Sequence, residues 1–279
     1  MTSSTRDHPV HAADRRHRIL ERVAEEQTIH VGDLAGELGV SEMTVRRDIR
    51  RLERDGFLRQ TYGGATAHVT RSYDLSFNAR ALQHAREKRL IGMRTTDCLA
   101  DARLLYLGIG TTAEQFARYL PARDGLTVVT ASLPIAGLLA TRPFRVVVLG
   151  GSVLRDELCC VGPTALRTLA AYRFDLAVIG AAGVSTEWGV TELTDEEAEV
   201  QRAVIERAAR LVVIADGSKL GQPTASVVGP AERVTTLVTD QSAPADEVEG
   251  LRRRGVDVVV VDGVRERSRP ALAATGADR

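Results

Sequence analysis

The fold of the first part of the chain is decided by the stretch LGVSEMTVRRDIRRLE, residues 38–53. Gly39 allows a tight turn, and the hydroxyl of Ser41 can accept a hydrogen bond from a free N–H group at the start of the helix that follows. Three apolar residues then recur at a spacing that places them on one side of a helix: Val45, Ile49 and Leu52. We therefore predict a helix over residues 40–53 with one buried side.

The opposite side of this predicted helix is basic. It presents a methionine and four arginines: Met43, Arg46, Arg47, Arg50 and Arg54. One arginine can bond O6 and N7 of a guanine together in the major groove, and other arginines neutralise phosphates. Ser41 and Thr44 lie near the helix start, where they can reach a phosphate or a base edge. The alternative is a solvated arginine face in which Asp48 and Glu53 serve solubility.

The elements on either side of this helix favour DNA binding. Two shorter helices are predicted before it, over residues 16–25 and 33–38, with Asp33 as the cap of the second. After it, residues 57–62 are predicted to form a small hairpin wing. Two wing residues are placed against the flanking DNA backbone: Arg59 and Gln60. This order of elements predicts a winged helix-turn-helix over residues 15–64, with the glycines at its end opening a linker.

From residue 77 onward, short apolar strands alternate with helices, which is typical of a largely parallel sheet covered on both faces. The predicted strands cover residues 104–107, 126–130, 145–149, 176–179, 211–215, 235–239 and 256–261. Helices are expected around residues 82–100 and, capped by Thr194, over 195–210. The predicted domains are a polar tail (1–14), the winged helix-turn-helix (15–64), a linker (65–76), an α/β effector-sensing and oligomerisation domain (77–262) and a C-terminal tail (263–279).

Composition limits the class of protein. The net charge is zero, with 37 basic and 37 acidic side chains, so any DNA-binding surface must be local. No apolar run approaches the roughly 18 residues of a membrane helix, and residues 1–14 lack the apolar core of a signal peptide, so we expect a cytoplasmic protein. The three cysteines form neither a disulfide framework nor a zinc pattern. All six histidines lie at or before His84, which leaves no histidine for catalysis or metal binding in the remaining two-thirds of the chain.

A glycine-rich turn, residues 108–113, follows the first strand of the predicted sheet and opens a helix. The sequence GIGTTA fits a dinucleotide-binding turn, but no acidic residue stands near the end of the next strand, where a ribose would need one. We prefer a phosphate cradle, because glycines let the backbone approach closely and the helix start offers free N–H groups and two threonine hydroxyls. The alternative is an ordinary strand–helix turn.

Further glycines and a lysine follow other strands at the edge of the sheet where open α/β sheets bind ligands. Lys88 and Lys219 are the two lysines among 37 basic residues, which indicates that a compact ammonium is needed where lysine is kept. We therefore place Lys219 in the site, with a surface lysine as the alternative. Glu197 and Arg202 either face the same crevice or form a solvated helix start. The predicted effector-binding residues are Gly108, Gly110, Thr111, Thr112, Gly150, Gly151, Gly180, Gly183 and Lys219.

Several short motifs follow one another from the predicted recognition helix to about residue 240. They are residues 38–49, Gly63-Gly64-Ala65, Gly110-Thr111-Thr112, Leu149-Gly150-Gly151, Val161-Gly162-Pro163, residues 180–183, Glu197-Ala198, Asp216 with Ser218-Lys219, and Thr239-Asp240. In combination they resemble the DeoR family of bacterial regulators. The resemblance implies a repressor, usually oligomeric, whose C-terminal domain is similar to ribose-phosphate isomerase and binds a phosphorylated sugar or related metabolite. It also implies that this binding releases the DNA.

The sequence departs from the family pattern at three positions. The family usually has Asp at the position of Gly108, Asn at that of Ala131 and Asp at that of Ala182. Such polar groups would hold sugar hydroxyls. We therefore expect either a less hydroxylated phosphate as the effector or a weakened control by ligand.

Three functions agree with these observations. The first is an operator-binding repressor that a phosphorylated metabolite releases, and the second is a DNA-binding protein whose sensor domain mainly oligomerises. The third is a sugar-phosphate isomerase with a fused DNA-binding module, which needs a positioned carboxylate base. Gly108 and Ala182 stand where acids would be expected, so that base is missing from the obvious places. We therefore expect a homo-oligomeric regulator that has no enzymatic activity, no cofactor and no metal.

Overall fold

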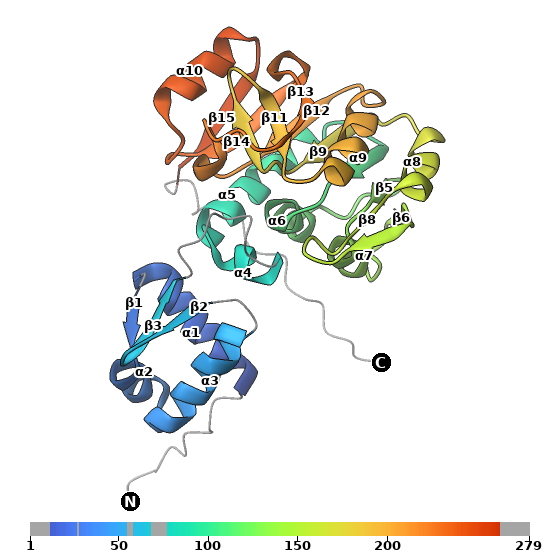
Figure 1. Ribbon diagram of the computed structural model, residues 1–279. Coiled ribbons are helices and arrows are strands. Elements are labelled where there is room, and N and C mark those ends of the chain that lie inside the picture. The colour runs from blue at the N-terminus through green and yellow to red at the C-terminus, as the bar shows by residue number, and fades with distance from the viewer. Residues whose placement is uncertain (1–11, 27, 55–57, 68–76, 263–279) are drawn as a thin grey trace, which may run out of the picture.

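The computed structural model describes residues 12–26, 28–54, 58–67 and 77–262. The chain forms a small N-terminal domain, in blue in Figure 1, and a larger α/β domain, in green to red. Most of the two predicted tails, residues 68–76 of the predicted linker and Phe57 of the predicted wing lie outside the described residues. Among the described residues, no helix is both long and apolar enough to pass through a bilayer.

The N-terminal domain packs three helices against a small antiparallel sheet. Its elements are α1 (Ala12–Glu26), β1 (Thr28–His30), α2 (Val31–Leu38), α3 (Glu42–Arg54), β2 (Leu58–Thr61) and β3 (Gly64–Ala67). The strand order is β1-β3-β2, with β2 and β3 as the wing. The three apolar residues predicted for the inner side of the recognition helix are buried in the core, which confirms that prediction: Val45, Ile49 and Leu52. Ser41 caps α3 by accepting a hydrogen bond from the N–H of Thr44 at 3.3 Å.

Three details of this domain differ from the sequence prediction. Helix α2 begins at Val31, so Asp33 lies in its first turn and not at the cap. Strand β1 was missed, because three residues are too few to show an alternating pattern. Strand β3 extends to Ala67, three residues into the predicted linker. Gly64 begins this strand, and a Cβ there would lie 1.9 Å from the carbonyl oxygen of Ile29, so β1 and β3 can pair this closely only through a glycine.

The larger domain is built on a seven-stranded sheet whose paired strands are all parallel, as predicted. Its strands are β4 (Leu104–Leu107), β5 (Thr127–Thr130), β6 (Arg145–Val148), β9 (Leu176–Ile179), β12 (Leu211–Ile214), β14 (Thr236–Asp240) and β15 (Asp257–Val261). Successive side chains of a strand enter different apolar clusters on the two faces of the sheet. In β9, Leu176 and Val178 join one cluster and Ala177 and Ile179 join the other.

Helices cover both faces of this sheet. The helices on one face are α5 (Ala85–Thr95), α6 (Thr111–Tyr119) and α7 (Leu133–Leu139), and those on the other are α8 (Pro163–Ala170), α9 (Asp195–Ile205) and α10 (Ala245–Arg253). The helix expected around residues 82–100 is α5, which is shorter and covers Ala85–Thr95. His84, in a left-handed conformation with φ 51°, separates it from the short helix α4 (Phe77–Leu82), which was not predicted. Helix α9 is capped by Thr194 as predicted, but it ends five residues before Arg210.

Two smaller sheets were not predicted. One is the hairpin of β7 (Ser152–Leu154) and β8 (Cys159–Val161), and the other contains β10 (Gly183–Ser185), β11 (Gly189–Glu192) and β13 (Ser226–Gly229). Each strand has only three or four residues, and, unlike the equally short β4 and β9, most contain polar residues or glycine that interrupt the apolar run.

The strand order β15-β14-β12-β9-β4-β5-β6 determines where a ligand can bind. The chain builds outward from β4 through β5 to β6, and then from β9 through β12 and β14 to β15 on the other side. The direction therefore reverses between β4 and β9. At such a switch point the loops that follow the two strands diverge, and a crevice opens at the carboxyl ends.

Candidate functional site

Helix α3 presents a basic face that is free of the protein core. Met43 is 63% exposed, and Arg47, Arg50 and Arg54 are also exposed, while Arg46 is partly covered. Within the part of the chain that the structure describes, Arg46 has one ion pair, at 3.3 Å to Glu42 one turn earlier. An exposed pair of this kind contributes little stability and can be given up to a phosphate.

Of the two other acids of this helix, Asp48 is not there for solubility, which corrects that part of the alternative, and the exposed Glu53 contacts the wing. Asp48 is buried and pairs with two arginines of α1, at 2.5 Å to Nε of Arg15 and 3.7 Å to Nη1 of Arg16. Glu53 accepts a hydrogen bond from the backbone N–H of Gln60 at 2.8 Å. Asp48 therefore joins α3 to α1, and Glu53 joins α3 to the wing. Their carboxylates are engaged within the domain.

The wing carries an aromatic residue that was not predicted as a contact. Tyr62 stands at the tip between β2 and β3 and is fully exposed. Gly63 follows it with φ 93°, a conformation that suits glycine and closes the tight turn. Arg59 is exposed and Gln60 is partly covered on β2.

A pocket lies at the carboxyl ends of the parallel strands, at the switch point between β4 and β9. Residues after three strands meet there, joined by side chains from α4, α5, the β7–β8 hairpin, β11 and α9. It is lined by Arg80, Lys88, Ile109, Gly110, Thr111, Thr112, Glu157, Gly180, Ala181, Ala182, Glu192, Leu193, Glu197, Ala215, Asp216 and Lys219. Both lysines of the chain are in this pocket.

The start of α6 forms one wall of the pocket. Gly110 occupies the cap position with φ 98°, where a side chain would be strained, and it has no side-chain cap partner. Thr111 and Thr112 begin the helix and are almost fully buried, so their hydroxyls are not simply surface groups. The positive end of the helix dipole and its free N–H groups make this wall suitable for an anion.

Three cations stand around this wall. Burial lowers the pKa of Lys88 to about 8, although the nearby carboxylate of Asp216 opposes the shift. Burial also lowers the pKa of Lys219. For Asp216, burial raises the pKa, but the charge of Lys88 and a hydrogen bond from Ser218 outweigh burial and leave its pKa lowered. Arg80, from α4, is the third cation and makes two hydrogen bonds to Glu157.

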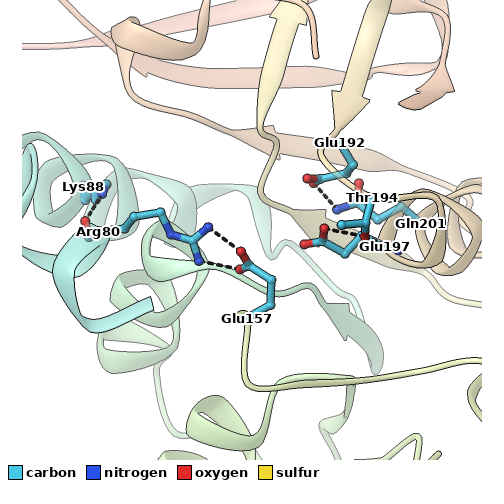
Figure 2. Close-up of polar contacts among 7 residues, drawn as sticks. All are labelled: Arg80, Lys88, Glu157, Glu192, Thr194, Glu197 and Gln201. Carbon is cyan, nitrogen blue, oxygen red and sulfur yellow. Dashed lines mark hydrogen bonds and ion pairs between the residues drawn. The ribbon is translucent and has the colours of Figure 1, made fainter. Parts of the chain in front are cut away.

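Three glutamates also line the pocket, Glu157, Glu192 and Glu197, and Figure 2 shows their polar contacts. Glu192 accepts a hydrogen bond from Nε2 of Gln201 at 2.6 Å, and Thr194 donates one to Glu197 at 2.7 Å. Burial, followed by the like charges of Glu197 and Glu157, raises the pKa of Glu192 well above its usual range. Burial and the charge of Glu157 raise the pKa of Glu197 to about 7. With a pKa of about 7, the Glu197 carboxyl group can be neutral near physiological pH and donate a hydrogen bond.

The structure places five of the nine predicted effector residues in the pocket: Gly110, Thr111, Thr112, Gly180 and Lys219. The other four lie outside its lining: Gly108, Gly150, Gly151 and Gly183. Close packing explains three of these four glycines. A Cβ at Gly108 would lie 3.0 Å from Cα of Ile179, at Gly151 2.5 Å from the carbonyl oxygen of Val161, and at Gly183 2.1 Å from that of Gln222.

The three residues that depart from the family pattern, Gly108, Ala131 and Ala182, do not all lie at the pocket. Gly108 is packed against β9, so an aspartate would not fit there without movement of the sheet. Ala131 is buried in the apolar core, and only Ala182 of the three lines the pocket. Arg202 points away, because its Nε donates to the carbonyl of Val227 at 2.8 Å.

Several pocket residues were missed in the sequence. Arg80, Glu157 and Glu192 come from short elements whose position cannot be read from local patterns. Lys88 could have been found, because the rarity of lysine that pointed to Lys219 applies equally to it. Carboxylates are also present in the crevice, although not at the positions first considered. Among the described residues, no group of three or more His, Cys, Asp or Glu side chains is arranged to hold a metal ion.

Comparison with known proteins agrees with both halves of this description. Residues 15–71 match the DeoR-like helix-turn-helix domain, and residues 83–241 match the DeoR C-terminal sensor domain. The chain belongs to the DeoR family. With this membership, the chain is a DNA-binding transcriptional regulator: the N-terminal domain, which contains α3, is its helix-turn-helix domain, and the α/β domain is its sensor domain.

Relatives align along nearly their full length. The HTH-type transcriptional regulator GlpR of Haloferax volcanii is 32% identical over 90% of this chain and 98% of its own. A putative aga operon transcriptional repressor of Escherichia coli O157:H7 is 28% identical over 89% and 94%. The glycerol-3-phosphate regulon repressor of Escherichia coli K12 is 26% identical over 85% and 94%. Among solved structures, ribose 5-phosphate isomerase A of Methanocaldococcus jannaschii is matched over 50% of this chain and 55% of its own, with 20% identity and a TM-score of 0.38.

The buried ion pairs of Asp48 lead to a stability prediction. Asp48→Asn removes the charge that holds Arg15 and Arg16, and we expect a loss of about 1.5–3 kcal/mol in the N-terminal domain. Hydrogen exchange of α1 and α3 in the full chain measures this loss. Asp33→Asn, at an exposed acid of the same domain, is the control. Equal exchange in both variants would show that the pair does not hold α3.

The raised pKa of Glu197 leads to a pH prediction. Its value is about 7 in the folded chain against an ordinary 4.5, so the folded state binds this proton more tightly. Glu197 therefore favours folding at low pH, and that contribution is lost as pH rises from about 4.5 through 7, by about 3 kcal/mol in total. The free energy of unfolding, measured with urea at pH 5.5 and at pH 8.5, should fall less between these two values in Glu197→Gln than in wild type.

The exposed neighbour Glu196 provides the control for this measurement. The free energy of unfolding of Glu196→Gln should fall with rising pH by the same amount as that of wild type. The same fall in the free energy of unfolding in all three proteins would mean that the pKa of Glu197 is not raised.

Proposed function

We propose that this protein is a homo-oligomeric repressor that leaves its operator when a phosphorylated metabolite binds the pocket of the sensor domain. The observation that carries this proposal is the meeting of both lysines of the chain with the start of α6 in one buried pocket. The name of the aligned glycerol-3-phosphate regulon repressor supports a small phosphate ester as the class of effector.

On the DNA side, we propose that the recognition helix enters the major groove with its basic face. The proposed contacts are Ser41, Met43, Thr44, Arg46, Arg47 and Arg50 from α3 and its cap, with Arg59 and Gln60 from the wing. Tyr62 at the wing tip is added to these for its exposure. Pairing of two chains would place two recognition helices on successive half-sites.

In the pocket, we propose that the phosphate group lies at the start of α6. Gly110, Thr111 and Thr112 supply backbone and hydroxyl donors, and Lys219 supplies charge. The remainder of the effector would then face Glu192 and Glu197, whose carboxyl groups can bond hydroxyls. These two glutamates offer the hydroxyl contacts that Ala182 cannot make, so a hydroxylated effector remains compatible with this pocket.

Isomerisation of a sugar phosphate is the second candidate function. It is favoured by one observation, a carboxyl group of pKa about 7, Glu197, in the same pocket as Lys219. A base of that pKa is suited to proton transfer at neutral pH. Interconversion of ribose 5-phosphate and ribulose 5-phosphate by the purified protein, lost in Glu197→Gln, would establish this activity. We expect no turnover, in agreement with the family.

A gel shift tests the main proposal. DNA from directly upstream of the protein's own gene is titrated with the protein in the presence of a panel of sugar phosphates and glycerol 3-phosphate. At least one ester should release the DNA, and the matching unphosphorylated compound should not. Full DNA binding with every ester, together with no shift in melting temperature, would favour a sensor domain that only oligomerises.

Arg47 provides the prediction for the DNA-binding face. Arg47→Ala should weaken operator binding by about 1–3 kcal/mol if it contacts a base, or flatten the salt dependence if it contacts a phosphate. The fold should be intact, because Arg47 points away from the core. Arg253→Ala, at an exposed arginine of α10, makes the same change in net charge and should bind DNA as wild type does. Unchanged footprints for Arg47→Ala would place the DNA elsewhere.

Lys219 and Thr111 provide the prediction for the effector. Lys219→Ala and Thr111→Val should each retain operator binding but lose release by the active ester, because the anion loses a charge or a hydroxyl donor. The gel shift with the active ester measures both steps. Normal release in both variants would exclude the start of α6 as the phosphate site.

A further inference from the structure

The short helix α4 contacts both the pocket and the N-terminal domain. Arg80 on this helix lines the pocket, and Leu82, two residues later, packs against the apolar core of the N-terminal domain. Helix α4 also lies against α1, as Figure 1 shows. A single helical turn therefore has one end in the sensing site and the other against the DNA-binding unit.

Helix α4 is held in place by the β7–β8 hairpin. The guanidinium of Arg80 donates two hydrogen bonds to the two carboxylate oxygens of Glu157, one of them at 2.5 Å (Figure 2). Both side chains are nearly buried, at 12% and 8% exposure, so the pair is little screened by water. The N–H of Phe77, at the start of α4, also donates to the carbonyl of Asp156 at 3.2 Å.

Lys88 connects the same helix to the rest of the pocket. Its ammonium group donates a hydrogen bond to the backbone carbonyl of Arg80, and its side chain is buried. Two of the three pocket cations thus stabilise the position of α4: Arg80 by its own side chain, and Lys88 by a side-chain hydrogen bond to the backbone of α4.

An anion that enters this pocket competes with Glu157 for Arg80. Carboxylate and phosphate oxygens match the planar fork of a guanidinium equally well, so the two groups can exchange on it. Glu157 would then be a buried carboxylate that has lost its hydrogen-bonded cation, in the same pocket as Glu192 and Glu197. A buried charge that has lost this partner is unfavourable, which would favour separation of the hairpin from α4.

We propose, resting on the proposed function above, that Arg80 is an effector-binding residue and that its ion pair with Glu157 is a latch that the anion opens. With the latch closed, α4 holds the N-terminal domain through Leu82 in the arrangement that binds DNA. Anion binding to Arg80 opens the latch, shifts α4 and lowers DNA affinity.

The test uses the full chain, a duplex selected by the wild-type protein from random sequences, and inorganic phosphate as the probe. Chloride at equal ionic strength is the reference, because salt alone weakens DNA binding. Two quantities are measured for each protein: the shift in melting temperature with phosphate, and the ratio of the DNA dissociation constants with and without phosphate. For wild type we expect a positive shift and a ratio of about 5 to 150, the usual range of coupling.

Leu82→Ala separates sensing from transmission. It leaves the pocket intact, so the melting-temperature shift with phosphate should remain, while the ratio of DNA dissociation constants should fall toward one. Leu90→Ala, at a similarly half-buried leucine of the sensor core, should retain the wild-type ratio. A wild-type ratio in Leu82→Ala would show that α4 does not transmit.

Glu157→Gln tests the latch without any ligand. The variant weakens the hold on Arg80, so DNA affinity in chloride should fall several-fold and phosphate should bind more tightly than to wild type. Glu232→Gln, which breaks the exposed ion pair with Arg254, is the control. It should change neither the DNA affinity in chloride nor the affinity for phosphate. Arg80→Lys keeps the charge but loses the fork, so its DNA affinity in chloride should lie between those of wild type and Glu157→Gln.

The experiment distinguishes failure of the latch from failure of the proposed anion site. If Glu157→Gln binds DNA in chloride as tightly as wild type does, the Arg80–Glu157 pair is not a latch, and this conclusion holds for any result with phosphate. If phosphate changes neither the melting temperature nor the DNA affinity of wild type, the proposed anion site is wrong, and the chloride measurement on Glu157→Gln still decides whether the latch holds the DNA-binding arrangement.

Discussion

The structure of the sensor domain depends on the cost of removing charge from water at the switch point between β4 and β9. Several charged side chains are buried there, and each has a partner of opposite charge or a hydrogen bond. Lys88 lies near Asp216, Arg80 bonds Glu157, and Gln201 bonds Glu192. Because an unpartnered buried charge is costly, these pairs fix the positions of α4, α5, α9 and the β7–β8 hairpin around one point. The parallel sheet is the platform, and charge pairing decides how the short elements assemble on it.

The sequence predicted the sheet well for a simple reason. A parallel strand buried on both faces appears as a continuous apolar run, and β4, β9 and β12 were each found to within one residue. The strands β7, β8 and β10 were missed because they are short and pair outside the main sheet. Glycines were the main source of error at the site. A glycine required by close packing, such as Gly108 against Ile179, looks the same in a sequence as one that approaches a ligand.

The pocket could be located but not completed from the sequence. The turn at the start of α6 and Lys219 are local signals, and both line the pocket. Arg80, Glu157 and Glu192 are far apart in the chain and meet only because of the order of strands and the position of α4. The same holds for the recognition helix. Its arginines were visible, but the inward position of Asp48 depends on Arg15 and Arg16 of another helix, so its role became clear only in three dimensions.

The distribution of the two kinds of basic residue has a consequence for how this protein meets its surroundings. The basic side chains of α3 and β2 are all arginines, whereas the lysines of the chain are both in the pocket. A guanidinium keeps its proton at every pH a cell reaches, but a buried amine can lose it. The basic face of α3 and β2 therefore keeps its charge at every cellular pH and offers no target to enzymes that acetylate lysine. Reactions specific to lysine amines would instead act on the pocket of the sensor domain, where both lysines lie.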